Sequence, residues 1–471
     1  MSIAINPGPS RKLAKRNSVL APTRTTPLAA SRAEGLRESG GTISLDTLAA
    51  YAAYMTSVTS AIVAFACVVP LAQQSESRTP NTSITSSTTP PIVAAKPAIP
   101  TVEELTQIAV KSRARHEIPA LVLAVVTKNG LESIAVDGVR VLGQPEAALA
   151  TDRMHLGSCT KAFTATLAAV LVADGKIGWN STIDEVLSKS FPNINEGWKS
   201  ATLEDLLRHR SGASSFPVAT DWATAFACNV SPSVCRNAFV QSMLERVPTQ
   251  KRGKHVYSNQ GYAIAGCMLE AVGGAAYEEL LRTRVLTPLG ISHEGFGPPT
   301  SADPASPKGH SLDGMALDGD NPTAIAPAAT LHMPVGEWAK FIAFHLGGTP
   351  PVGLEGAAKE LENLHKAGPD APKEGLGWIT ARRDWGGDVL THSGSNTQWY
   401  CTAWLAPERG FAVLAATNQG GERAQRACDE SCSFAIKARN AGVASVAPAA
   451  PSAPSDATGS SPTPSGNSTS N

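Results

Sequence analysis

The sequence carries no net charge and no block of basic residues, since 40 Lys and Arg are balanced by 40 Asp and Glu among its 471 residues. Because a nucleic-acid-binding protein neutralises phosphates with clustered Lys and Arg, we expect no nucleic-acid partner. The eight cysteines are too few to form the disulfide scaffold of a chain this long. The composition therefore indicates a globular middle with an apolar core.

Several signature motifs are also missing. No Cys-x-x-Cys pair and no His-Glu-x-x-His occurs, so we expect no metal site. The sequence has no Gly-x-Ser-x-Gly, no Gly-x-Gly-x-x-Gly and no P-loop, which disfavours an α/β-hydrolase, a dinucleotide enzyme and an NTPase. We therefore expect chemistry carried by side chains alone, without a cofactor.

Both ends of the sequence differ in composition from the middle. Residues 1–77 are expected to form a leader in which segment 55–72 resembles a signal peptide or a membrane anchor. The reason is the uncharged apolar run Ala61–Leu71, which follows scattered basic residues. Residues 78–100, rich in Thr, Ser and Pro, are expected to form a disordered linker, and residues 438–471 a disordered tail.

The leader predicts an exported protein, either periplasmic or tethered to a membrane through its N-terminal segment. The alternative is that the leader is no signal, or that Met55 is the true start, which would make the protein cytoplasmic. Cys228 and Cys235 flank a polar loop and can form a bridge if the protein is exported. The oligomeric state stays open.

The middle, residues 101–437, is expected to form one split domain of α/β plus all-α class. Asn129-Gly130 is a hairpin signal between two apolar strands, and residues 179–329 read as helical pieces broken by Gly and Pro. Because strands lie at both ends and helices between them, we expect an antiparallel sheet flanked by helices, with an inserted helical lobe. The later strands are expected at 376–382, 388–392, 399–405 and 411–417, before a last helix at 421–439.

The first motif with possible chemistry is Ser158-Cys-Thr-Lys161. On a helix, Ser158 and Lys161 lie one turn apart on the same face, and the turn at Gly157 would place Ser158 at the helix N-terminus. Free N–H groups there stabilise an oxyanion, and a buried lysine loses proton affinity and can act as a base. The alternative is an ordinary helix start with an exposed lysine. The apolar helix face that follows Lys161 argues against this alternative.

The second motif is Tyr257-Ser-Asn259. A tyrosine close to a lysine ammonium can exchange protons near neutral pH, and the amide of Asn259 can bind a substrate carbonyl or Lys161. The third motif is His392-Ser-Gly394-Ser395, in which a glycine on a strand would let substrate lie close and the Ser395 N–H would complete an oxyanion hole.

Competing third motifs exist at three lysines. The tripeptides are Lys128-Asn-Gly130, Lys251-Arg-Gly253 and Lys366-Ala-Gly368. The first is the hairpin turn and precedes the other motifs, the second comes before Tyr257, and the third lies in a Gly/Pro-rich loop. Only His392 stands between two predicted strands, so it is favoured.

The ordered set Ser-Cys-Thr-Lys, Tyr-Ser-Asn and His-Ser-Gly resembles the β-lactamase and penicillin-binding serine hydrolases, in their class C-like branch. This branch includes class C β-lactamases, DD-peptidases, D-aminopeptidases and family VIII carboxylesterases. The resemblance covers about residues 101–437 and includes Leu206-Leu-Arg-His-Arg-Ser-Gly212 and the segment Trp404–Asn418.

This resemblance implies a role for each matching residue. Ser158 would be the acylated nucleophile, with Lys161 and Tyr257 sharing the proton transfers. Asn259 would contact substrate, and His392 and Gly394 would wall the site. The N–H groups of Ser158 and Ser395 would hold the oxyanion.

One departure from the class C pattern affects the substrate. Class C β-lactamases carry Lys-Thr-Gly at the third motif, whereas this chain has His-Ser-Gly, as in the peptidase and esterase members. The resemblance therefore predicts an acyl-enzyme hydrolase of D-amino-acid or peptidoglycan-type peptides, or of small carboxyl esters. The alternatives are a class C-like β-lactamase and a penicillin-binding sensor module that does not turn over.

Overall fold

The computed structural model describes residues 99–368 and 373–444. The predicted leader, most of the linker and the end of the predicted tail lie outside the described residues. Within the described ranges, no helix is both long enough and apolar enough to cross a bilayer.

The centre of the domain is a six-stranded antiparallel sheet in the order β2-β1-β11-β10-β9-β8. Strand β1 near the start of the domain pairs with β11 near its end, as expected for a split domain. The strands are β1 (Ala120–Thr127), β2 (Gly130–Gly138), β8 (Ile379–Arg383), β9 (Gly387–Ser395), β10 (Tyr400–Ala406) and β11 (Phe411–Thr417).

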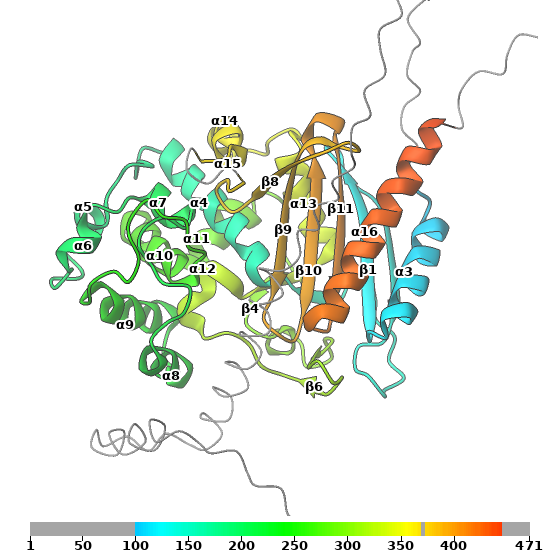
Figure 1. Ribbon diagram of the computed structural model, residues 1–471, viewed down its shortest axis with the longest axis horizontal. Coiled ribbons are helices and arrows are strands. Elements are labelled where there is room, and N and C mark those ends of the chain that lie inside the picture. The colour runs from blue at the N-terminus through cyan, green and yellow to red at the C-terminus, as the bar shows by residue number, and fades with distance from the viewer. Residues whose placement is uncertain (1–98, 369–372, 445–471) are drawn as a thin grey trace, which may run out of the picture. The chain divides into compact units, whose positions relative to one another are not determined.

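The sheet separates two apolar layers. Because successive side chains on a strand point to opposite faces, Val122 and Ala124 of β1 join one core cluster while Leu121 and Leu123 join the other. Helices α3 (Val102–His116) and α16 (Gly421–Ala444) cover the second face. Figure 1 shows them on the side of the sheet opposite to the helical lobe.

The helical lobe is inserted between β2 and β8, as the sequence predicts, and packs beside α4 (Thr160–Ala173) and α13 (Val335–His345). Its helices are α5 (Ile183–Leu187), α6 (Glu196–Lys199), α7 (Leu203–Leu207), α8 (Ala219–Ala227), α9 (Pro232–Leu244), α10 (Asn259–Gly273), α11 (Tyr277–Leu281) and α12 (Ala326–Ala329). Two further short helices, α14 (Glu355–Lys359) and α15 (Leu361–His365), precede β8.

Short strands absent from the sequence-based prediction tie the lobe to the sheet region. A three-stranded sheet joins β3 (Arg153–His155), β7 (Leu331–Pro334) and β4 (Gly295–Phe296), and β5 (Gly309–His310) pairs with β6 (Ala316–Leu317). Strand β3 matters for the site because it leads directly into the segment that carries Ser158.

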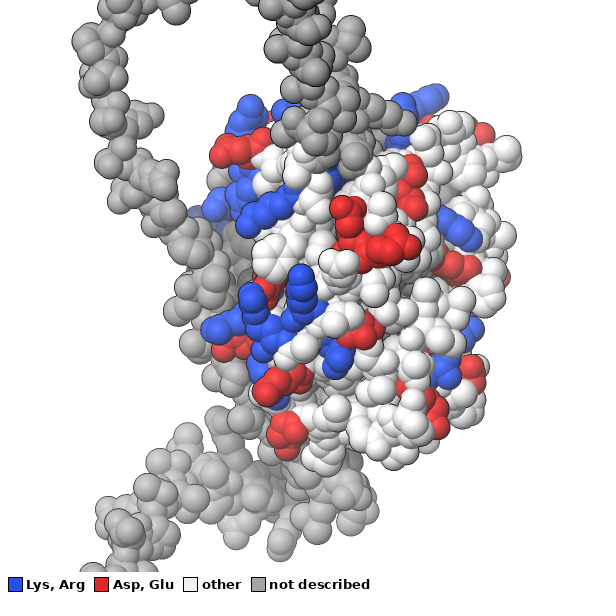
Figure 2. Space-filling model, turned by 90° about the vertical axis from the view of Figure 1, so that its right-hand side faces the viewer, with Lys and Arg blue, Asp and Glu red and all other residues white. Residues whose placement is uncertain are grey.

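The predicted end of the domain at residue 437 is wrong, because α16 continues to Ala444. Arg439, two residues beyond that predicted end, packs on the domain: its guanidinium lies 3.6 Å from the centroid of the Phe411 ring, and the residue is only 6% exposed. Cys228 and Cys235 form a disulfide between α8 and the start of α9. On the face of the protein in Figure 2, basic and acidic side chains lie next to one another.

Candidate active site

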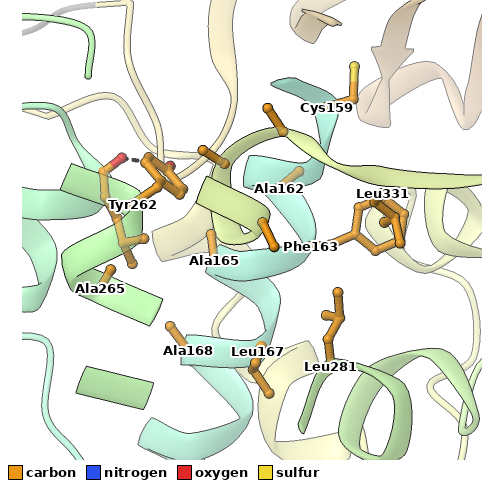
Figure 3. Close-up of a cluster of buried hydrophobic side chains, with 14 of the residues drawn as sticks. Cys159, Ala162, Phe163, Ala165, Leu167, Ala168, Tyr262, Ala265, Leu281 and Leu331 are labelled. Carbon is orange, nitrogen blue, oxygen red and sulfur yellow. Dashed lines mark hydrogen bonds between the residues drawn. The ribbon is translucent and has the colours of Figure 1, made fainter. Parts of the chain in front are cut away.

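Ser158 lies in a single 3-10 turn, Gly157–Cys159, that leads into α4. Gly157 has a φ of +46°, a left-handed conformation that favours glycine. Every residue of α4 from Thr160 to Leu171 is buried. Figure 3 shows α4 inside the core, with Phe163 toward Leu331 and Leu167 toward Leu281. The serine thus stands just before a helix that is buried over its first twelve residues.

Lys161 points back to Ser158 across one helical turn, as the spacing predicts. Its Nζ lies 3.2 Å from Ser158 Oγ, 2.7 Å from Asn259 Oδ1 and 3.2 Å from the Ala328 carbonyl oxygen. The side chain is fully buried. The first two predicted motifs therefore meet at one lysine nitrogen, and the third hydrogen-bond partner of that nitrogen is a carbonyl of α12.

Burial lowers the pKa of Lys161 from 10.5 to about 7, since the ammonium form loses its hydration. Smaller opposing contributions from Cys159 and Glu374 raise it. A substantial fraction of Lys161 is consequently neutral at physiological pH. The neutral amine can donate to Asn259 and Ala328 and still direct its lone pair at the hydroxyl of Ser158.

The second motif is held by a helix cap. Ser258 caps α10: its Oγ accepts from the Gly261 N–H at 3.2 Å and donates to the Ser214 carbonyl at 2.6 Å. Asn259 is the first residue of α10, so the cap fixes its direction toward Lys161. The centroid of the Tyr257 ring lies 4.7 Å from Lys161 Nζ, and this residue is 37% exposed.

His209 contacts two residues of the second motif. Its Nδ1 accepts from the Ser258 N–H at 3.0 Å, and the centroids of its ring and the Tyr257 ring are 4.4 Å apart. Burial, and then the nearby Lys161, hold the pKa of His209 well below 6.5. His209 therefore packs against residues of the site.

The third motif lies against the turn that bears Ser158. Gly394 and Ser395 are the last two residues of β9, which extends past the predicted end at His392. A Cβ on Gly394 would lie 1.9 Å from the Leu156 carbonyl oxygen and 2.9 Å from the Ser158 nitrogen. A Cβ on Gly157 would lie 2.4 Å from the Ser395 nitrogen. The two backbone segments that carry the predicted oxyanion donors are thus in direct contact.

This contact predicts the effect of Gly394→Ala. Because the new methyl group would overlap backbone rather than a movable side chain, the Ser158 turn and β9 must separate. We expect hydrolysis to fall by more than about 10-fold, since a misplacement of 1 Å in a catalytic site costs up to ~100-fold. Turnover per labelled serine would measure it, with Gly178→Ala, whose Cβ would make only ordinary contacts of 3.6 Å or more, as a control away from the site. Unchanged turnover in Gly394→Ala would contradict this packing argument.

His392 is buried near Lys161 and is 6% exposed. Its Nδ1 lies 2.8 Å from the Ser393 carbonyl, to which it donates. Burial, and secondarily the charge of Lys161, lower the pKa of His392 to about 3. The imidazole is therefore neutral across the physiological range and supplies no fixed positive charge.

The competing motif at Lys366 belongs to a different environment. The Lys366 carbonyl accepts from Arg208 Nη1 at 2.8 Å, and a Cβ on Gly368 would meet the Arg208 side chain. The Ser158 turn packs on Gly394 instead. The structure therefore brings together all seven predicted site residues: Ser158, Lys161, Tyr257, Asn259, His392, Gly394 and Ser395.

Sequence reasoning missed two acidic residues near the site. Asp320 contacts His155, which stands three residues before Ser158. Glu374 Oε1 lies 3.5 Å from Nε2 of His255, two residues before Tyr257. Neither acid lies in a motif or a periodic segment, so no local pattern identifies them. Among the residues that the structure describes, no group of three or more His, Cys, Asp or Glu is placed to hold a metal ion.

This chain is similar to proteins of one known family. The sequence matches the β-lactamase family over residues 105–430. The chain belongs to the β-lactamase family. Penicillin-binding protein 4 of Amycolatopsis lactamdurans is 26% identical over 330 residues, which cover 65% of this chain and 83% of that protein.

Two further relatives extend the comparison. Unguisins hydrolase ungD' of Aspergillus campestris is 23% identical over 340 residues, covering 67% of this chain and 61% of that hydrolase. The solved structure of D-alanine carboxypeptidase AmpC from Burkholderia cenocepacia superposes with a TM-score of 0.59 at 14% identity, covering 71% of this chain and 98% of that one. The β-lactamase-like fold predicted from the sequence is confirmed. The chain is a serine hydrolase of the β-lactamase family, and its identity to these relatives is low.

Proposed function

We propose that this protein hydrolyses amide or ester bonds through an acyl-enzyme on Ser158. The observation that carries the proposal is the 3.2 Å contact between Ser158 Oγ and the buried Nζ of Lys161. A hydroxyl is a weak nucleophile at neutral pH and needs an adjacent base. Lys161 meets that need because burial brings its pKa to about 7, close to physiological pH.

The proposed reaction follows from this contact. As Ser158 Oγ attacks the substrate carbonyl carbon, neutral Lys161 takes the hydroxyl proton, while the N–H groups of Ser158 and Ser395 bind the developing oxyanion. The proton then passes to the leaving group, with Tyr257 sharing the transfer, and the acyl-enzyme forms. A water molecule, deprotonated by the same groups, attacks the ester in turn and releases the acid.

The neutral His392 bears on the class of substrate. Without a cation at this position, a carboxylate on the substrate gains no ion pair from the third motif, which disfavours proficient β-lactam hydrolysis. Uncharged small esters remain, as do peptide-type amides whose binding does not depend on an ion pair at this position, and the retained Asn259 favours amides slightly. The relatives named penicillin-binding protein 4 and putative D-alanyl-D-alanine carboxypeptidase support the peptide-type amides.

Labelling followed by a chase tests the proposal. The full chain would be treated with a fluorophosphonate and, separately, with a fluorescent penicillin, and mass spectrometry would locate the label. We expect label on Ser158, loss of the penicillin label during the chase, and turnover of nitrophenyl esters or D-Ala-D-Ala peptides. A penicillin label that persists, without turnover of any of these substrates, would instead indicate the sensor module. No label at all would refute the proposal.

Substrate charge is tested at His392. We expect His392→Lys to raise kcat/KM on a cephalosporin by roughly 10-fold, because a cation about 4 Å from a carboxylate gains about 1 to 4 kcal/mol. Activity on uncharged esters should stay flat or fall. A second ammonium beside Lys161 would disfavour the positive charge that Lys161 acquires when it takes the Ser158 proton. Steady-state kinetics on a cephalosporin and on its methyl ester would measure the effect.

The gain should vanish for the methyl ester, which has no carboxylate. His392→Gln is the matched control, since it keeps a neutral polar side chain and should leave the ratio of anionic to neutral substrate unchanged. An unaltered ratio in His392→Lys would show that this residue does not face the substrate.

A further inference from the structure

A buried carboxylate joins the two backbone segments that carry the predicted oxyanion donors. The Asp320 side chain, 3% exposed, lies between β6 and α12. Its Oδ2 accepts from His155 Nε2 at 2.9 Å. Its Oδ1 accepts from Asn396 Nδ2 at 2.9 Å and from the Asn321 N–H at 2.7 Å. Burying a charge is costly unless donors surround it, and here three donors do so.

One arm of this network reaches the nucleophile turn. The Nδ1 atom of His155 accepts the N–H of Gly157 at 3.0 Å, so the ring proton must be on Nε2, which donates to Asp320. The carboxylate thereby selects the tautomer that can hold Gly157. The same logic makes an aspartate orient the histidine in serine proteases, although His155 contacts a backbone amide here.

The other arm reaches the end of β9. Asn396 directly follows Ser395, and its amide donates to Asp320 while its Oδ1 accepts the Gln398 N–H at 3.2 Å. This orientation of the amide is required, because the carboxylate can only accept. A single carboxylate therefore braces both the residue before Ser158 and the residue after Ser395.

We propose that Asp320 is a positioning residue that sets the spacing between the Ser158 and Ser395 N–H groups, and with it the strength of the oxyanion hole. The inference rests on the proposed acyl-enzyme function. Asp320 touches neither Ser158 nor Lys161 through its hydrogen bonds, so it acts through His155 and Asn396. Donors of an oxyanion hole contribute only when they are placed for the tetrahedral state, so their spacing affects kcat more than substrate binding.

Asp320→Asn tests this role without changing side-chain size. All three partners of Asp320 donate, and an asparagine has only one accepting oxygen. If its NH₂ group faces His155, the His155 proton shifts to Nδ1 and the hydrogen bond with the Gly157 N–H is lost. If the NH₂ group faces Asn396 and the Asn321 N–H instead, the hydrogen bonds from those two donors are lost. We expect kcat on a nitrophenyl ester to fall about 10-fold to 100-fold, with KM within about twofold.

A boronic acid supplies the readout that separates positioning from general stability. Phenylboronic acid adds to the serine oxygen as a tetrahedral anion, so its affinity should weaken by about the same factor as kcat. Rates would be normalised to the serines labelled at completion by a fluorophosphonate, which removes any unfolded fraction. The charge-exchanged double variant, Asp320→Asn with Asn396→Asp, restores one donor–acceptor pair and should recover part of kcat.

Asp318→Asn is the matched control. This nearby aspartate is 44% exposed and pairs with Lys308 at 3.8 Å, outside the network, so its replacement should change neither kcat nor boronate affinity. If Asp320→Asn keeps kcat per labelled site and boronate affinity within twofold of the wild type, the positioning role is refuted. If the wild type itself neither takes label nor turns over ester, the proposed function fails instead, so the two failures are distinguishable.

Discussion

Ser158→Ala is expected to abolish covalent labelling and to lower ester hydrolysis by about 10⁴-fold or more, since the loss of a serine nucleophile removes the whole acylation route. The fold should survive. The hydroxyl loses its contact with Lys161, worth about 1 kcal/mol, which corresponds to a few degrees in Tm at most. Thermal unfolding and intact-protein mass spectrometry would measure the two effects side by side.

The neighbouring Cys159 should not replace the missing serine. Its Sγ lies 3.6 Å from the Sγ of Cys401 on β10, and both cysteines are buried. Burial raises the pKa of the Cys159 thiol well above 9, so almost no thiolate is present at neutral pH.

Ser431→Ala is the matched control for the nucleophile. Its Oγ donates to the Cys428 carbonyl at 2.9 Å within α16, so the variant removes a buried serine hydroxyl on the face of the sheet opposite to the lobe. We expect it to label and turn over as the wild type does. Label retained in Ser158→Ala, or found on a different serine of the wild type, would overturn the assignment.

The site was largely predictable because its residues fall in three short motifs. The Ser158–Lys161 spacing is a property of any helix, and the apolar residues after it imply burial. Both features follow from local sequence, and the structure contains both. Resemblance to a family then linked Tyr257 and His392 to Ser158 across more than 90 residues of chain, which no local pattern can do.

The residues that support the site could not be predicted, because they belong to no short motif. His209 and His155 look like packing histidines, and Asp320 stands in an irregular loop, so their contacts exist only once the lobe has closed on the sheet. A buried aspartate has no sequence signal of its own, because its donors come from separate segments.

The fold shows a parallel contrast. The long central strands were predicted because they are continuously apolar, as in the buried run of β1. Strands β3 to β7 have only two to four residues each, too few for a periodic pattern, and tertiary contacts create them. The domain end was misplaced at residue 437 because the contact of Arg439 with Phe411 joins segments that are distant in the sequence.

The rate of acylation is expected to depend on pH through Lys161. Burial disfavours its ammonium form and brings its pKa to about 7, so below that value Nζ is protonated and has no lone pair for the Ser158 proton. With an uncharged nitrophenyl ester, kcat/KM should therefore fall about tenfold per pH unit below pH 7 and level off above it. A profile from pH 5 to 9 at constant ionic strength would measure it.

Two variants separate a base from a mere cation at this position. Lys161→Met removes both charge and base, whereas Lys161→Arg keeps a charge that cannot be lost because the guanidinium pKa exceeds 12. If Lys161 is the base, both variants should lose about 10² to 10⁴ in acylation rate. If only its positive charge mattered, Lys161→Arg would retain most of the rate and the proposed role would be wrong.

Tyr257→Phe completes the test because Tyr257 is the other group placed to move the proton. The ring contact with Lys161 survives this change, since only the hydroxyl is removed. If Lys161 is the base, the variant should be slower but should keep the fall in rate below pH 7. Loss of that fall in Tyr257→Phe would transfer the role of base from the lysine to the tyrosine, because the titrating group would then depend on the phenol.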